Sequence, residues 1–308
     1  MSLHPFLQKI LKKSALLPPM TSLPVAELRA GDATRYQTRV PLDEVFATED
    51  RWIPGPRGQL RVRIYTPSAA PSLPVTVFFH GSGFVICNIE SHDPMCRQIC
   101  RRSGSIVVSV DYALAPENRF PAAPDDCLAA TRWVAEHAHA FGGDAGRLAV
   151  AGDSAGGNLA AVTALRLRDQ DGPALRGQLL MYPVTDHYSA QHPSYEQRAD
   201  GFGLTRADMV WFWNHYVPDP EQGAHPHASP LRAKNLAGLP SAFVVTADYD
   251  VLRDEGNAYA TRLRQAGVPV TLKRYPDANH GFMFWVGIME SAGEAMDASC
   301  AWLKEVLG

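Results

Sequence analysis

The stretch AGDSAGGN, residues 151–158, decides how the rest of the sequence is interpreted. An apolar, strand-like run precedes it and a helical pattern follows it, so Ser154 stands at a strand-to-helix turn. Gly152 and Gly156 complete a Gly-x-Ser-x-Gly pattern, because larger side chains at these two positions would collide with the strand and the helix. The start of the helix also directs amide groups and positive dipole toward the serine. The pattern therefore predicts that Ser154 is a nucleophile and not merely a helix-capping serine.

Strand-like and helix-like segments alternate around this turn from about residue 44 onward. Strands are expected at 60–67, 75–80, 105–112, 147–154, 177–183, 242–248 and 268–276. Helices are expected at 93–103, with Asp93 as the N-cap, and at 124–140, 155–169, 253–266 and 288–306. This alternation predicts an α/β fold, with a mostly parallel sheet covered by helices on both faces.

Two regions depart from the alternation. Residues 185–230 show no clear strand, and together with residues 1–40 they are interpreted as an added helical layer. Long insertions of this kind in α/β proteins are often lids. The expected division is thus a helical cap, residues 1–40 and 185–230, and an α/β core, residues 41–184 and 231–308.

A nucleophilic serine needs a base and a group that orients the base, in the chain order serine, acid, histidine. His280 follows the strand at 268–276 and is the candidate base. Asp248 and Asp250 follow the strand at 242–248, and spacing alone does not choose between them. The nearby acids Asp254 and Glu255 fall on the next helix, where we expect them to be solvated or ion-paired.

The stretch FFHGSGF, residues 78–84, breaks an apolar strand with a glycine-rich turn. Only such a turn exposes successive backbone N–H groups to an incoming oxygen. Acyl transfer passes through an oxyanion that must accept N–H groups from two directions. The turn at residues 80–83 and the N–H of Ala155, directly after the serine, are the expected sources.

Together, the segments HGSGF, DYALAPENRFPAAPDD, GDSAGGNLA, TADYDVLRDEG and HGF closely resemble the hormone-sensitive-lipase family of serine carboxylesterases, the bacterial family IV type. The resemblance covers nearly the whole chain from about residue 45. It implies an eight-stranded α/β-hydrolase core with a helical cap. It also implies that Asp250 is the acid of a triad with Ser154 and His280, while Asp248 is structural.

By the same resemblance, Ser82, Gly83 and Ala155 supply the oxyanion-hole N–H groups, and His80 holds the shape of the loop. The family usually has three glycines where this chain has Gly81-Ser82-Gly83. The hole survives this departure if the backbone angles suit a serine, and we expect the Ser82 hydroxyl to bond a neighbouring group, not the substrate.

Composition limits the partners and the compartment. The formal charge is -3, with Lys+Arg 29 against Asp+Glu 32, so no basic surface favours nucleic acid. The 5 cysteines include no Cys-x-x-Cys pair, which favours a reducing compartment, and we expect a cytoplasmic protein. No segment approaches the ~18 apolar residues of a membrane-spanning helix. No cofactor or metal is expected: His225 and His227 lack a third ligand, and the glycine turns lack the dinucleotide fingerprint.

The expected activity is hydrolysis of small carboxylic esters with short or medium acyl chains, as the resemblance implies. Phe84, Trp211, Phe212 and Phe282 are the candidate substrate contacts, although aromatic residues also pack a cap onto a core. A lactonase, amidase or thioesterase with the same triad, and a non-catalytic receptor on this fold, remain as alternatives. The family also suggests a homodimer through the edge strand at 268–276.

Overall fold

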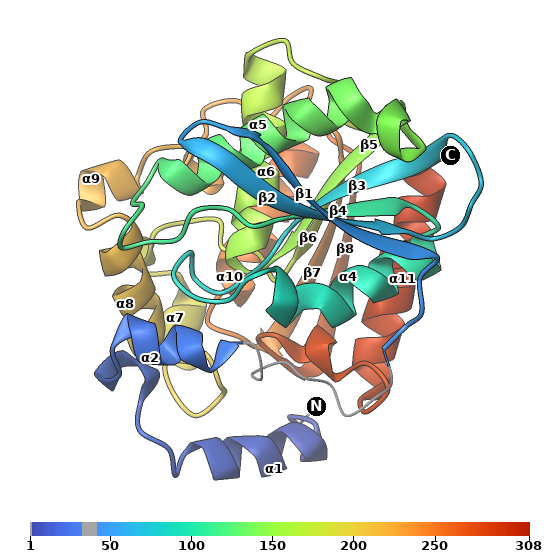
Figure 1. Cartoon of the computed structure of the whole chain (residues 1–308). Coiled ribbons are helices and arrows are strands. Elements are labelled where there is room, and N and C mark those ends of the chain that lie inside the picture. Colours follow the sequence, from blue (N-terminus) through green and yellow to red (C-terminus); the bar gives the residue numbers. More distant parts are fainter. Residues whose placement is uncertain (1, 33–41) are drawn as a thin grey trace.

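An eight-stranded sheet runs through the centre of the protein (Figure 1). The computed structural model describes residues 2–32 and 42–308. The strand order is β1-β2-β4-β3-β5-β6-β7-β8. The pairs β1/β2 and β2/β4 are antiparallel, and every later pair is parallel. This is the α/β-hydrolase architecture, and it confirms the predicted fold class.

The elements alternate along the chain as predicted. The strands are β1 (Ala47–Gly55), β2 (Gly58–Thr66), β3 (Leu73–Phe79), β4 (Ile106–Val110), β5 (Gly143–Asp153), β6 (Gly177–Met181), β7 (Ser241–Tyr249) and β8 (Val270–Asn279). The helices are α1 (Pro5–Ser14), α2 (Val25–Ala30), α4 (Ile89–Ser103), α5 (Ala122–His137), α6 (Ala155–Asp169), α7 (Pro193–Gln197), α8 (Arg206–Tyr216), α9 (Pro220–Gly223), α10 (Arg253–Gln265) and α11 (Glu290–Leu307).

Strand β1 lies outside the predicted strands. It forms the edge of the sheet and pairs only with β2, so most of its side chains are exposed. The segment has acidic and basic residues and a proline, which suit an edge strand but weaken any apolar pattern. The apolar periodicity of the sequence therefore did not predict this strand.

Helices cover both faces of the sheet, which confirms the predicted layering. Helices α5, α6 and α10 pack on one face, and α4 and α11 pack on the other. The central strands are buried on both sides, as the fully buried β4 and β6 illustrate. The carboxyl ends of the parallel strands thus meet at one edge of a rigid layer.

Helix α4 begins earlier than expected. Its N-cap is Asn88, whose side chain accepts the N–H of Ser91 (2.9 Å), while the Ser91 hydroxyl accepts the N–H of Asn88 (3.0 Å). The expected cap, Asp93, lies inside the helix and pairs with Arg97 at 2.6 Å. The helix therefore starts at this reciprocal capping box, and not at Asp93 and Pro94, where the sequence predicted its start.

The remaining helices form a layer outside the sheet. Figure 1 shows α2, α7, α8 and α9 grouped on one flank of the sheet, with α1 below them. Helix α7 contacts α10, and α8 contacts the short 3₁₀ turn Met20–Ser22. Residues 185–230 contain no strand, in line with the sequence, whereas residues 33–40 of the expected cap lie outside the described residues.

Candidate active site

Ser154 lies on the tight turn between β5 and α6. Its backbone has φ 55° and ψ -119°, a strained conformation for a residue with a side chain. A Cβ atom on Gly156 would come within 1.9 Å of the Phe79 carbonyl oxygen, and one on Gly152 within 2.2 Å of the Gly156 carbonyl oxygen. Both glycines are therefore required by close packing against β3 and α6, as the sequence pattern predicted.

Three side chains from distant parts of the chain meet at this turn. His280, one residue beyond β8, places Nε2 2.9 Å from the Ser154 hydroxyl oxygen. Its Nδ1 lies 2.8 Å from Oδ2 of Asp250, which directly follows β7. An ionised carboxylate accepts only, so Nδ1 carries the proton and Nε2 offers its lone pair to the hydroxyl. The site can therefore take a proton from Ser154.

The four acids that lie close together in the sequence have different partners in the structure. Asp250 is 1% exposed, and its other oxygen accepts the N–H of Leu252 at 2.9 Å. The Asp248 carboxylate instead accepts a hydrogen bond from Arg274, and Asp254 pairs with Arg253 at 2.7 Å. Only Asp250 among them contacts the imidazole of His280.

Glu255 does not fit the expectation of a solvated or ion-paired acid. It is 0% exposed, and its Oε1 accepts the backbone N–H groups of Thr185 (2.7 Å) and Asp186 (3.3 Å). Burial raises the pKa of this carboxyl well above its ordinary value. Its place in the first turn of α10 resembled an ordinary helix N-terminus, so the sequence alone did not indicate this buried contact.

The glycine-rich loop after β3 lies beside the serine turn. His80 is fully buried and stacks on Tyr112 (4.3 Å between ring centres), whose hydroxyl donates to the His80 carbonyl oxygen at 2.7 Å. Burial lowers the pKa of His80 to about 3, so its ring is neutral. The ring is thus packed within the loop, and its lowered pKa makes it a weak base.

Ser82 and Gly83 both have positive φ angles, 109° and 61°. The Ser82 hydroxyl bonds the carbonyl oxygens of Gly81 and Ile86, so it is directed at neighbouring backbone. No acceptor among the described residues takes the backbone N–H of Ser82, Gly83 or Ala155. These N–H groups remain available to another acceptor.

The four candidate aromatic contacts occupy different environments. A Cβ atom on Gly83 would come within 2.2 Å of the Phe212 ring, so this ring lies directly on the loop. Trp211 packs edge to face against Phe212, with 5.3 Å between ring centres. Phe84 and Phe282 are 1% and 0% exposed and lie inside the hydrophobic core.

Tyr182 is a neighbour of the site that the sequence analysis missed. It directly follows β6, and its ring packs edge to face on the His280 ring, with 4.9 Å between ring centres. Its position at the carboxyl end of a central strand was the available signal, because ligand sites of α/β sheets gather at these ends.

Further features of the described chain concern metal-ligating side chains, the cysteines and the length of its apolar helices. Across residues 2–32 and 42–308, no group of three His, Cys, Asp or Glu side chains is arranged to hold a metal ion. His225 and His227 contact each other edge to face, at 4.8 Å between ring centres. All five cysteines are buried, and none of them forms a disulfide bond in the described residues. In the same ranges, no helix is both long and apolar enough to cross a bilayer.

The sheet order and the strand–serine–helix turn define the class of proteins with the α/β-hydrolase fold. Residues 76–284 match the family model described as the alpha/beta hydrolase fold. The chain belongs to this family and, within it, to the hormone-sensitive-lipase group of carboxylesterases. The predicted resemblance is thereby confirmed.

Named relatives and a solved structure agree with this placement. The chain is 43% identical over 273 residues to the esterase LipI of Mycobacterium tuberculosis, covering 87% of this chain and 85% of that protein. It is 40% identical to an ethyl acetate hydrolase of Pseudomonas putida, over 77% of this chain and 76% of that one. The hyperthermophilic esterase of Pyrobaculum calidifontis superposes over 100% of both chains, with a TM-score of 0.95 and 38% identity. The protein is a carboxylic ester hydrolase that acts on small esters, as predicted.

Proposed function

We propose that Ser154, His280 and Asp250 form the catalytic triad of this esterase. His280 takes the proton of Ser154 as its oxygen attacks the ester carbonyl carbon. The protonated His280 then gives this proton to the leaving alcohol, and an acyl-serine remains. His280 next removes a proton from water as the water oxygen attacks the acyl-serine carbonyl carbon. It then gives this proton to the serine oxygen as the serine–acyl bond breaks and the carboxylic acid is released. The observation that carries the proposal is the His280 ring lying between Ser154 (2.9 Å) and Asp250 (2.8 Å).

The N–H groups of Ser82, Gly83 and Ala155 bind the oxyanion in this proposal. They come from two elements that meet at Ser154: the loop after β3 and the first residue of α6. Their lack of acceptors among the described residues supports this role. The positive end of the α6 dipole adds to the stabilisation of negative charge.

We further propose that residues 1–40 and 185–230 act as the cap over a core of residues 41–184 and 231–308. Phe212 on α8 forms the wall of the substrate site nearest the oxyanion loop, and Trp211 supports it. Phe84 and Phe282 shape the site from behind, since both are buried in the core. The apolar wall suits an uncharged ester with a short or medium acyl chain, and the relative named for ethyl acetate supports this class.

The reaction needs no cofactor, because the triad and the N–H groups supply each step. We propose a cytoplasmic location, which five buried cysteines without a disulfide bond support. We also propose a homodimer through β8, because β8 lies at the edge of the sheet.

An acyl-length series of p-nitrophenyl esters, from acetate to laurate, tests the activity and its range. The wild type should give its highest kcat/KM with the short and medium chains, and Ser154→Ala should lose at least ~10³-fold in kcat at every length. Matched lactone, amide and thioester substrates separate the alternative hydrolase classes. Equal turnover by Ser154→Ala would contradict the proposal.

A further inference from the structure

A second buried histidine lies beneath the oxyanion loop and takes no part in the proposed cycle. His92, in the first turn of α4, is 1% exposed and packs edge to face on Phe284 (5.1 Å between ring centres). Its Nε2 lies 3.3 Å from Oδ1 of Asp153, which is 2% exposed and directly precedes Ser154. A carboxylate this deeply buried is stable only when it is paired or hydrogen-bonded.

The Asp153 carboxylate also holds the oxyanion loop. The backbone N–H of Gly81 donates to the same oxygen, Oδ1, at 2.8 Å. A Cβ atom on Gly81 would come within 2.4 Å of Oδ2, so the loop rests directly on the carboxylate. Gly81 immediately precedes Ser82, so the position of the carboxylate helps to fix the positions of the backbone N–H groups of Ser82 and Gly83.

Both ring nitrogens of His92 have polar neighbours. Nδ1 lies 2.9 Å from the Ser91 hydroxyl oxygen, and this hydroxyl donates to the Asn88 carbonyl oxygen at 2.7 Å. Nε2 lies 3.3 Å from Oδ1 of Asp153 and 3.3 Å from the Gly81 nitrogen. The imidazole therefore contacts both partners of the hydrogen bond that holds the loop.

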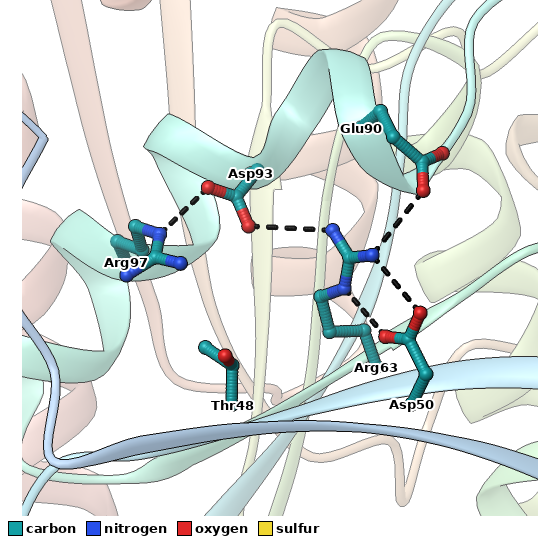
Figure 2. Close-up of a pocket in the computed structure, with 6 residues that line it drawn as sticks. All are labelled: Thr48, Asp50, Arg63, Glu90, Asp93 and Arg97. Carbon is teal, nitrogen blue, oxygen red and sulfur yellow. Dashed lines mark hydrogen bonds and ion pairs between the residues drawn. The ribbon is translucent and has the colours of Figure 1, made fainter.

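Arg63 of β2 holds the turn of α4 that carries His92. Figure 2 shows Glu90 and Asp93 of α4 directed at Arg63 of β2, in a polar cavity of about 540 Å³. Arg63 bonds Glu90 at 3.2 Å and Asp50 of β1 at 2.6 Å. The Asn88/Ser91 capping box holds the start of the same turn. His92 is thus delivered to Asp153 by a turn with little freedom to shift.

We propose that His92 is a positioning residue for ester hydrolysis: it holds the Asp153 carboxylate, which in turn sets the oxyanion loop through Gly81. This proposal rests on the proposed oxyanion hole. Loss of the Nε2 contacts with Asp153 and Gly81 would let the carboxylate and the loop shift, and a displacement of about 1 Å at such a site can cost ~10²-fold in rate. Ground-state binding of the ester, which depends on the apolar walls, would change little.

The test compares His92→Phe with His92→Gln. The phenyl ring keeps the packing on Phe284 but removes the ring nitrogens, whereas the glutamine amide restores a polar group near Asp153 and Gly81. We expect His92→Phe to lower kcat on p-nitrophenyl acetate by about 10- to 100-fold, with KM within about twofold. His92→Gln should recover most of the lost kcat. Arg101→Gln, an exposed change on the same helix, is the matched control and should keep wild-type kcat.

A double-mutant cycle with Asp153→Asn separates positioning from general loss of packing. The amide in this variant still offers an oxygen to Gly81 but changes the group that faces His92, and we expect the pair of changes to be strongly non-additive in kcat. The proposal is overturned by unchanged kcat in folded His92→Phe, by an effect confined to KM, by failure of His92→Gln to restore kcat, or by additivity. If His92→Phe does not fold, wild-type kcat in Asp153→Asn overturns it. A wild type without esterase activity would refute the proposed function instead.

Discussion

Ser82 holds a backbone conformation that glycine adopts more readily, with φ 109°. Its hydroxyl bonds the carbonyl oxygens of Gly81 and Ile86, which ties the two sides of the oxyanion loop together. Strain of this kind is of order 1–3 kcal/mol, and a hydrogen bond offsets about 1 kcal/mol. The side chain therefore compensates for a conformation that a glycine would adopt without strain.

Ser82→Gly should leave the active site working. Relief of strain, loss of the hydroxyl contacts and the larger freedom of glycine in the unfolded chain nearly cancel, so the free energy of unfolding should change by about 1 kcal/mol or less. We expect kcat within about threefold of wild type, a difference below about 1 kcal/mol in activation free energy. Steady-state kinetics and urea unfolding measure both. A thousandfold loss of kcat would show that the hydroxyl takes part in the chemistry.

Asp250→Asn should lower kcat by about 10³- to 10⁴-fold, because an amide no longer selects the tautomer in which Nε2 of His280 accepts the serine proton. Asp248→Asn, two residues earlier in β7, is the matched control. Its carboxylate bonds Arg274 and not His280, so kcat should stay near wild type. Both values come from steady-state kinetics on one activated ester. Equal losses in the two variants would contradict the assignment of the acid.

At the scale of elements, α10 is joined to the segment after β6 through a buried acid. Glu255 accepts two backbone N–H groups from residues 185–186, where the chain leaves the core and enters the outer helical layer. Burial raises its pKa above the ordinary value of 4.5, so the folded protein binds this proton more tightly than the unfolded chain does. The contribution of Glu255 to stability is therefore fully present below about pH 4.5 and is lost as the pH rises above it.

The substitution Glu255→Gln tests this pH dependence of stability. Glutamine keeps an oxygen for Thr185 and Asp186 but cannot ionise, so the variant should gain stability relative to wild type as the pH rises from about 4.5 to about 8. Urea unfolding across this range measures the difference in the free energy of unfolding. Glu305→Gln, an exposed change on α11, should show no such trend. If the difference in the free energy of unfolding stayed constant with pH, the pKa of Glu255 would be the same in the folded and unfolded protein, which would contradict the prediction.

At the scale of the whole molecule, the sequence predicted the sheet, its helical layers and the nucleophile turn. Gly152, Ser154 and Gly156 had a recognisable spacing because local sterics dictate it. The choice of Asp250 over Asp248 depends on which carboxylate reaches a ring thirty residues later, and no local pattern encodes that distance. Resemblance to the family supplied this choice where spacing did not.

The features that were missed depend on contacts between distant elements. Strand β1 is held by cross-strand pairing with β2 and by charged residues, not by an apolar pattern. Glu255 is buried by a segment seventy residues earlier in the chain. Tyr182 reaches His280 only after β6 and β8 are assembled in one sheet. Periodicity and motif spacing report local geometry, so such long-range contacts became apparent only in the folded chain.

Covalent labelling of Ser154 by a fluorophosphonate tests the central claim most directly, because the reagent requires a serine activated by its histidine and stabilised in the oxyanion hole. Intact-mass and peptide mass spectrometry should show one phosphonyl group per chain, on Ser154, and His280→Ala should abolish rapid labelling. An active wild type that carries no label on Ser154, or carries it on another residue, would contradict the account.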